Sequence, residues 1–245
     1  MSQLELALHA HVTPRHVSFV ETGRANPSRE MVLTLARALD VPLRERNRLL
    51  LAAGYAPSYR QSELDEPALA QVRAALDRML RQQEPYPAVV LDRYWNVTQT
   101  NDPAAAMFAW LLEGSRPPNP PNVVRLIFGA LRPYVANWNE FGEALIQRVH
   151  REAVGGVPDV RTNELLDEVL ASGGVPSAWK APDFIATRLP IIPVEFSRDG
   201  LAVSYFSTVT TLGTPQDITL QEIRVELFFP ADDATVAHRW SGSEA

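Results

Sequence analysis

The first 27 residues constrain the fold most, because they carry the start and stop signals of two short helices joined by a tight turn. Ser2 is placed to cap a first helix, and Thr13 is placed to cap a second helix that has Pro14 at its first position. Gly23 then follows the last residues with helical apolar spacing and is expected to end the second helix. Two capped helices with a turn of about three or four residues between them form a helix-turn-helix.

The second helix of such a pair places its N-terminal residues against base edges in the major groove of double-stranded DNA. We therefore predict that the helix over residues 13–22 reads DNA, with the Arg15 guanidinium suited to guanine and the His16 ring able to donate to a base. Gln3 is expected to reach a phosphate or to brace this helix, and two polar residues of the following loop are expected to contact the backbone. The predicted DNA-binding residues are Gln3, Thr13, Arg15, His16, Ser18, Arg24 and Asn26.

The charge distribution favours a nucleic-acid partner for the N-terminal part alone. Residues 1–60 contain 8 Arg and 5 acidic residues, a net charge of +3, whereas residues 61–245 contain 15 Lys or Arg and 24 acidic residues, a net charge of −9. Phosphate contacts need positive charge, and this charge lies with the helix-turn-helix. An ordinary helical hairpin with solvated charges is the plain alternative.

The composition excludes several classes of protein. No apolar run approaches the roughly 20 residues of a membrane span, and we expect neither a membrane span nor a secretory signal. There is no Cys, so neither a disulfide framework nor a thiolate metal site is expected, and the protein is expected to be cytoplasmic. The spacing of His9, His11 and His16 does not place two rings on one helix face, and no catalytic motif is present. We predict no metal, no resident cofactor and no enzymatic activity.

The rest of the chain predicts an α+β domain. Composition divides the chain into a helix-turn-helix domain at 1–58, a linker and connecting helix at 59–85, and a second domain at 86–245. The second domain opens with two strand-like segments around a turn near residues 93–96, and turn residues divide the three strand-like segments that close it. This order predicts one antiparallel sheet with helices over a face. The expected helices are 67–83, 102–112, 122–128, 130–152 with a break at Pro133, and 163–171, and the expected late strands are 189–196, 202–211 and 220–229.

Several motifs resemble those of known families. Residues 2–7 and 12–28 resemble the phage-repressor or Xre class of DNA-binding domain. The motif at residues 92–97 (Asp-Arg-Tyr-Trp-Asn-Val), Asn137-Trp, residues 206–223 and Phe229-Pro-Ala-Asp resemble the ligand-binding domain of MmyB-like regulators. The resemblance covers nearly the whole chain. It implies a PAS-like domain that binds a fatty-acid-like ligand, in a homodimeric regulator of actinobacterial metabolism. The family's DNA-binding domain has a further helix before the one that starts at Ser2, so the first helix of that domain is expected to be missing here.

An acyl ligand needs an apolar pocket and one or two donors for its head group. Phe108, Trp138, Phe141 and Phe206 are candidates for the apolar lining, and arginine, asparagine and threonine side chains are candidates for the donors. The predicted ligand-binding residues are Arg93, Asn101, Phe108, Arg125, Arg132, Asn137, Trp138, Phe141, Phe206 and Thr208.

The sequence therefore predicts a ligand-responsive transcription regulator that binds a DNA operator as a homodimer. One alternative is an adaptor that uses the Xre fold to bind a protein, with no DNA role. A second is an enzyme that acts on an acyl substrate in the PAS-like pocket, against which the lack of a recognisable nucleophile argues.

Overall fold

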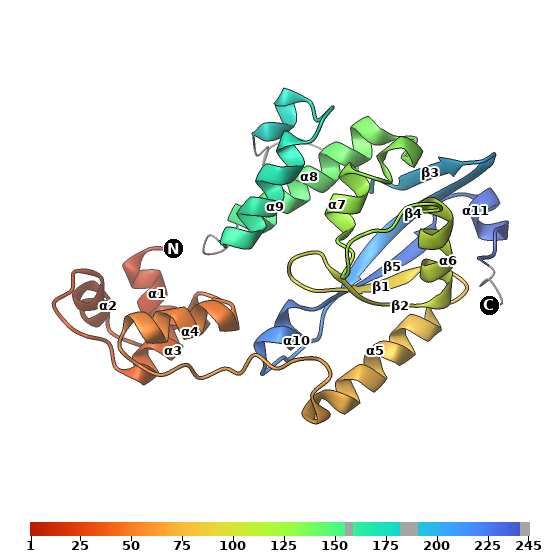
Figure 1. The fold of residues 1–245 in the computed structure, drawn as a ribbon. Helices are drawn as coiled ribbons and strands as arrows, with labels where there is room; N and C mark the ends of the chain where they lie inside the picture. Colours follow the sequence, from red (N-terminus) through yellow and green to blue (C-terminus); the bar gives the residue numbers. More distant parts are fainter. Residues whose placement is uncertain (155–158, 182–190, 241–245) are drawn as a thin grey trace. The chain divides into compact units, whose positions relative to one another are not determined.

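Contacts between residues divide the chain into two units in the computed structural model, which describes residues 1–154, 159–181 and 191–240. The N-terminal unit comprises Met1–Glu66 together with Leu212–Glu222, and the second unit comprises Pro67–Thr211 and Ile223–Ala245. The chain therefore crosses from one unit to the other three times. Each unit is described by itself below (Figure 1).

The N-terminal unit is helical, as its caps predict. Thr13 Oγ1 accepts a hydrogen bond from the His16 N–H at 3.3 Å, and the Ser2 side chain forms a reciprocal capping box with Glu5. Gly23 has a φ of +69°, a left-handed conformation that glycine adopts without strain, and it follows the second helix. The helices of this unit are α1 (Gln3–His9), α2 (Pro14–Glu21), α3 (Arg29–Ala38), α4 (Leu43–Ala52) and α10 (Ile218–Glu222).

Small residues let α1 and α2 approach closely. Ala7 and Ala10 on the α1 side and Val17 on α2 are all buried, so the helix-turn-helix pair has an apolar interior. Leu4 and Leu8, which the sequence places on the apolar face of α1, are 57% and 66% exposed in this structure. Among the described residues, no other element covers that part of α1.

The second unit is built on one antiparallel sheet with the strand order β2-β1-β5-β4-β3. Register aligns Val89 with Glu226, Tyr205 with Val194, and Ser207 with Phe228, so alternate residues of each strand share one face. The strands are β1 (Ala88–Leu91), β2 (Val97–Thr100), β3 (Val194–Arg198), β4 (Leu201–Thr210) and β5 (Arg224–Pro230).

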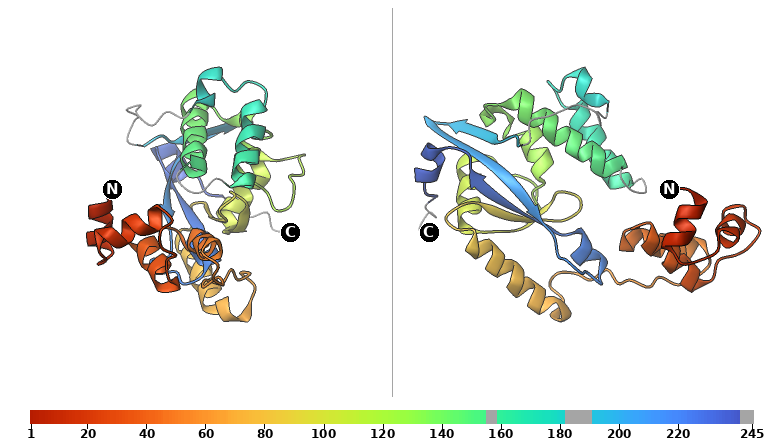
Figure 2. Two further views of the ribbon diagram at one scale, coloured as in Figure 1. Left: turned by 90° about the vertical axis from the view of Figure 1, so that its left-hand side faces the viewer. Right: turned by 180° about the vertical axis from the view of Figure 1, so that it is seen from behind.

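Helices cover this sheet on both sides. Figures 1 and 2 show α7, α8 and α9 on one side, with α5 on the other. The main core of the unit lies between the sheet and the helices, and it includes the fully buried Trp95, Met107 and Tyr205. The helices are α5 (Ala70–Gln82), α6 (Asp102–Leu111), α7 (Val123–Phe128), α8 (Trp138–Val154), α9 (Val160–Ala171) and α11 (Asp233–Ala237), with 3-10 turns at Pro67–Leu69, Arg132–Tyr134 and Ser177–Lys180.

The predicted α+β domain with an antiparallel sheet is confirmed, and so is the helical N-terminal domain. Three segments differ from the prediction. The expected strand 220–229 begins only at Arg224, because residues 218–222 form α10. Alternating apolar and polar residues predict a strand here, but the hydrogen bonds that α10 makes within the N-terminal unit favour a helical turn. The expected strand 189–196 begins only at Val194, and the expected helix 130–152 is a 3-10 turn at Arg132–Tyr134 followed by α8 from Trp138. Residues 189 and 190 of the expected strand 189–196 lie outside the described residues.

Candidate functional site

Helix α2 carries both predicted base-reading residues, of which only Arg15 is exposed; the His16 Nε2 atom is buried with no hydrogen-bond partner among the described residues. Arg15 is exposed, and its guanidinium lies 5.1 Å from the centroid of the Phe19 ring one helical turn later. This contact orients the arginine along the helix while leaving its donors available to a partner. His16 and Ser18 are half-buried beside it.

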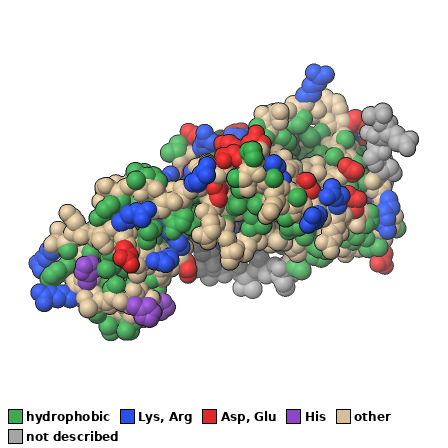
Figure 3. Space-filling model, turned by 90° about the horizontal axis from the view of Figure 1, so that it is seen from below, with side chains coloured by type: hydrophobic (Ala, Val, Ile, Leu, Met, Phe, Trp, Pro, Cys, Tyr) green, Lys and Arg blue, Asp and Glu red, His purple; other side chains and the backbone are tan. Residues whose placement is uncertain are grey.

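Two of the predicted DNA-binding residues have structural contacts within the unit. Thr13 caps α2, as described above, and the Gln3 side-chain amide donates to the Glu21 carboxylate at the other end of α2. Gln3 thus braces the helix, which is one of its two predicted roles. Arg24 and Asn26 are exposed in the loop that follows α2. Figure 3 shows arginine and histidine side chains on the surface of the N-terminal unit.

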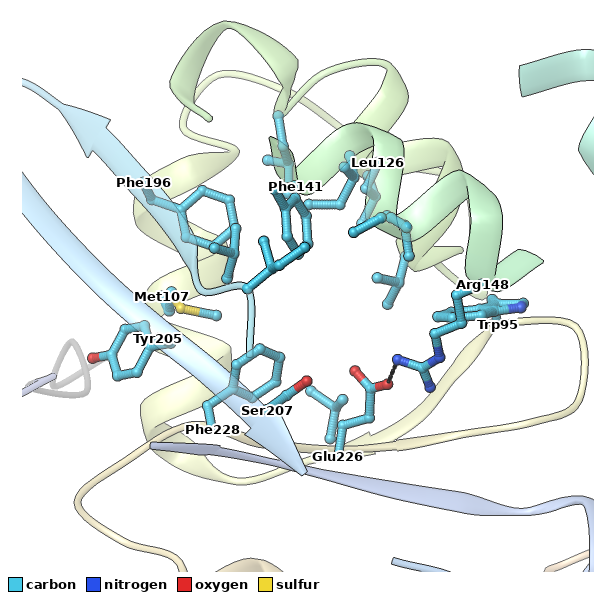
Figure 4. A pocket seen from close by; sticks show the side chains of 18 of the residues that line it. Trp95, Met107, Leu126, Phe141, Arg148, Phe196, Tyr205, Ser207, Glu226 and Phe228 are labelled. Carbon is cyan, nitrogen blue, oxygen red and sulfur yellow. Dashed lines mark ion pairs between the residues drawn. The ribbon is translucent and has the colours of Figure 1, made fainter. Parts of the chain in front are cut away.

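The second unit contains an apolar cavity of about 370 Å³ between the sheet and the helices α6, α7 and α8. This volume lies within the usual range for small-molecule sites, about 300–1,000 Å³. The strands contribute Val89, Tyr205 and Phe228 to the lining, and α6 and α7 contribute Met107 and Leu126. Figure 4 shows Met107 close to Tyr205, and Leu126 across the cavity from both. Burial raises the pKa of the Tyr205 hydroxyl above its ordinary value, so this side chain is neutral near pH 7.

Helix α8 presents one face to this cavity. Phe141, Leu145 and Arg148 follow each other at intervals of four and three residues, and Arg151 comes one turn later, so all four lie on the same face. The face changes from apolar to basic along its length. The cavity therefore has an apolar end near Phe141 and a polar end near the two arginines.

A buried ion pair closes the polar end. Figure 4 shows Arg148 facing Glu226, with 2.6 Å between the Arg148 Nη1 and Glu226 Oε1 atoms. Only 6% of the Glu226 side chain is exposed, so its carboxylate has lost most of its contact with water. The ion pair with Arg148 compensates for this loss of hydration. Ser207 adds a hydroxyl group to the lining.

Trp95 holds the arginine in place. The Arg148 and Arg224 guanidinium groups each lie 4.4 Å from the centroid of its ring, and Arg224 pairs with Glu152 at 2.6 Å. Such cation–π contacts contribute about 0.5–2 kcal/mol each, more when they are desolvated. Trp95 has a φ of +68°, which the turn imposes: the Asp92 carboxylate accepts hydrogen bonds from the backbone and side chain of the residues that follow it.

Arg151 differs from Arg148 in having no ion-pair partner in the described part of the chain. It is exposed and lines the same cavity, so a ligand anion can reach it without displacing a carboxylate. Arg148 is already neutralised by Glu226. Of the two arginines, Arg151 is therefore the better placed to receive a ligand carboxylate.

Phe108 and Phe141 are the two predicted ligand-binding residues that line the cavity. Phe206 and Thr208 lie on the opposite face of β4, because Tyr205 and Ser207 point into the cavity and side chains alternate along a strand. Phe206 instead stacks on Phe229, with 5.5 Å between the ring centroids. The binding roles of Phe206 and Thr208 remain predictions.

The three arginines of the prediction each have a partner in the protein and do not line the cavity. Arg93 pairs with Asp159 at 3.2 Å, and the Arg132 guanidinium donates to two backbone carbonyls in residues 173–174. Arg125 pairs with Glu168 at 2.8 Å, and hydrogen bonding to that carboxylate raises the pKa of Arg125. Their roles in ligand binding also remain predictions.

The remaining three predicted residues hold elements together outside the lining. The Asn137 amide donates to the Pro193 carbonyl at 2.7 Å and accepts from the Glu195 N–H at 3.0 Å, which fixes the chain against β3. Trp138 packs edge-on against Phe128 at 5.1 Å between centroids. Asn101 caps α6.

The polar end of the cavity was not predicted, although the sequence carries the signals for it. The same helical period that relates Phe141 to Leu145 continues to Arg148 and Arg151. The alternation that faces Phe228 inward also faces Glu226 inward. What the sequence does not provide is the pairing of β5 beside β1 and β4, which brings Glu226 under α8.

Neither a metal site nor a membrane span is found among the residues that the structure describes. No group of three or more His, Cys, Asp or Glu side chains there could hold an ion. No helix in the same part of the chain is long and apolar enough to cross a bilayer.

These features define a class of protein: a helix-turn-helix unit joined to an α+β domain with an internal small-molecule cavity. A family model described as helix-turn-helix matches residues 1–46. The model of the MmyB-like transcription regulator ligand binding domain matches residues 72–240, and the chain belongs to this family. Both are DNA-binding or ligand-binding families rather than families of enzymes, and the Xre-like and MmyB-like resemblances of the sequence are confirmed.

Other comparisons add little. No curated protein matches the chain. A solved structure, described as an RNA-binding Light-Oxygen-Voltage receptor, is 12% identical with a TM-score of 0.31 over 93% of this chain and 53% of that chain. This chain thus spans about half the length of that structure, and a TM-score this low does not indicate a shared fold.

Proposed function

We propose that this protein is a homodimeric transcription regulator that reads an operator through α2 and senses a fatty-acid-like metabolite in its cavity. The two family matches support a ligand-responsive transcription regulator with a helix-turn-helix. The observation that supports the ligand class is the cavity itself. It is apolar at one end, and at the other end it has the guanidinium of Arg151, which has no ion-pair partner among the described residues. A fatty acid has the same division into an apolar chain and an anionic head. The protein would act in the cytoplasm, with its operator.

The binding of DNA is proposed to use Arg15 and His16 for base edges and Arg24 and Asn26 for the backbone. A dimer would place two copies of α2 about one helical turn of DNA apart, so we expect a two-fold operator. Arg15→Ala should relax the preference for one base by about 1–3 kcal/mol, whereas Arg24→Ala should weaken all sequences alike. Binding to duplexes selected from a random pool, measured at several salt concentrations, separates the two effects. Equal affinity for all sequences, or binding unchanged by both substitutions, would instead favour the protein-binding adaptor.

The ligand is tested with dodecanoate as the probe. Isothermal titration should show one site per chain, and Arg151→Gln should weaken dodecanoate binding about tenfold, the loss expected for one charge-assisted hydrogen bond of about 1.4 kcal/mol. Arg78→Gln is the matched control, because Arg78 is an exposed arginine on α5 that does not line the cavity. The ligand class is wrong if dodecanoate fails to bind, or if both variants bind it as the wild type does.

A further inference from the structure

The connection between β4 and β5 belongs to the N-terminal unit, although the strands on both sides of it belong to the second unit. Residues 212–222 group with the helix-turn-helix helices, and they lie inside the 72–240 match to the ligand-binding family. The ligand-binding sequence thus contributes a piece of the DNA-binding unit. This piece includes helix α10.

Helix α10 completes the start of α4. The residue before α4 is Pro42, whose side chain cannot accept the hydrogen bonds that a helix start offers. The Gln221 side chain of α10 supplies the missing acceptor, with 2.7 Å between its Oε1 and the Leu43 nitrogen. Beside it, Arg44 and Glu222 form a two-bond ion pair with both distances at 2.8 Å. The Arg44 and Glu222 side chains are 21% and 17% exposed, so this pair is shielded from solvent more than a surface pair.

A second set of hydrogen bonds joins the start of α10 to the chain that follows α4. The Ile218 N–H donates to the Arg60 carbonyl at 2.9 Å, and the Thr219 hydroxyl donates to the Ser62 carbonyl at 2.7 Å. The Asp217 carboxylate accepts from the Ser62 N–H at 3.2 Å. Asp217, Ile218 and Ser62 are all buried, so these bonds are protected from water.

The strands that carry this segment line the cavity. Thr210 and Val225 form the last pair of the β4–β5 ladder before the segment. Glu226, which closes the polar end of the cavity, lies four residues after Glu222, and Ser207 lies five residues before Leu212. A ligand that displaces these strand residues therefore acts on both ends of the segment that docks on α4.

We propose that the 212–222 segment carries the ligand signal to the helix-turn-helix, through docking of α10 on the start of α4. This inference rests on the proposed function, because it requires a ligand in the cavity. Docked and released α10 are the two states, and a ligand changes DNA affinity by the ratio of its affinities for them. The coupling between the two sites depends on the Gln221 and Glu222 contacts. Loss of these contacts therefore uncouples the cavity from the helix-turn-helix, while the cavity still binds ligand and the helix-turn-helix still binds DNA.

The test measures the DNA dissociation constant of the full chain with and without saturating dodecanoate, by fluorescence anisotropy on the selected operator. In the wild type we expect the two DNA dissociation constants, with and without dodecanoate, to differ by a ratio of about fivefold or more, which is the lower end of common allosteric couplings. In the double variant Gln221→Ala, Glu222→Gln this ratio should fall to less than twofold, while dodecanoate still binds saturably in the absence of DNA. A wild-type ratio retained in the double variant would overturn the proposal, as would a wild-type ratio near one with dodecanoate bound.

Three further variants control for damage to the fold. Gln216→Ala changes an exposed residue of the same segment and should leave the ratio at its wild-type value. The exchanged pair Arg44→Glu, Glu222→Arg keeps the two charges adjacent and should restore a ratio of at least threefold, which the single change Glu222→Arg should not. Equal loss in the single and exchanged variants would count against a role for this ion pair.

An experiment without ligand tests the proposed role of the 212–222 segment separately from the proposed ligand class. Ser207→Leu adds apolar volume to the cavity wall, and hydrogen exchange is then followed in peptides that cover α10 and the start of α4. We expect at least a threefold change in exchange rate there, and no change in α3. If dodecanoate does not bind the wild type, the proposed ligand is wrong and this experiment still tests the role of the segment. Unchanged exchange in α10 would overturn it.

Discussion

Asn101 offers the sharpest test of how the second unit is held together. Its side chain is 5% exposed and makes four hydrogen bonds, all to backbone groups. The oxygen accepts from the Ala88 N–H of β1 at 2.9 Å and from the Ala104 N–H of α6 at 3.0 Å. The amide nitrogen donates to the carbonyls of Leu80 at 3.1 Å and Tyr86 at 2.8 Å. One amide therefore ties together α5, β1 and α6.

The magnitude follows from this count. Loss of a helix N-cap costs about 1 kcal/mol, and each of the other three bonds contributes about 1 kcal/mol, so Asn101→Ala should destabilise the fold by about 4 kcal/mol. For a chain of this size, that corresponds to a melting temperature lower by roughly 8–16 °C. Asn101→Asp keeps both accepting bonds and loses the two donated ones, so about 2 kcal/mol or more should be lost.

Urea denaturation followed by circular dichroism measures these losses. The matched control is Asn139→Ala, an exposed asparagine on α8, for which we expect a change within about 0.5 kcal/mol. A loss of under 1 kcal/mol for Asn101→Ala would refute the argument that four buried bonds depend on this side chain. At a temperature where the variant is folded, dodecanoate affinity should match the wild type, whereas a head-group role would lower it.

Three further changes test single contacts. Glu226→Gln should destabilise the fold by about 2 kcal/mol in urea denaturation, because the Arg148 guanidinium loses its buried counter-charge. Burial, with Arg239 nearby, lowers the pKa of His238, so the unfolded chain binds a proton at this ring more readily than the folded chain does. The wild type should therefore lose stability relative to His238→Gln as the pH falls below about 6.5. Equal pH dependence of stability in the two proteins would contradict this. Gly174→Ala should lower the free energy of unfolding by about 1–2 kcal/mol, because φ is +80° and the added Cβ would meet the Arg132 side chain. Gly173→Ala, with open space around the added Cβ, should change it little in the same urea denaturation experiment.

Local signals predicted the elements of this fold well. Caps such as Ser2 and Thr13 and the left-handed Gly23 mark helix ends through bonds between residues near each other in sequence. Such bonds can be read without knowing the rest of the fold. Phe108 and Phe141, two of the apolar candidates for a ligand pocket, do line the cavity.

The polar end of the site depends on contacts between residues far apart in sequence. Arginine and asparagine look alike in sequence whether they meet a ligand or a neighbouring backbone group. Arg93 meets Asp159, 66 residues later, and Asn137 meets Pro193. Only the strand order brings Glu226 beneath Arg148. The helical state of residues 218–222 likewise depends on Leu43 and Arg44, which lie almost 180 residues before them.

The three crossings between units also set limits on how this chain can be cut or recombined. A fragment that stops at Glu66 would leave the Leu43 N–H and the Ser62 backbone without the partners that α10 provides. A chimaera that exchanges the helix-turn-helix must therefore exchange residues 212–222 with it, as two separate cassettes inserted at matching points. A change of DNA specificity by exchange of the helix-turn-helix thus requires a matching change in residues 212–222, which are encoded roughly 150 codons downstream.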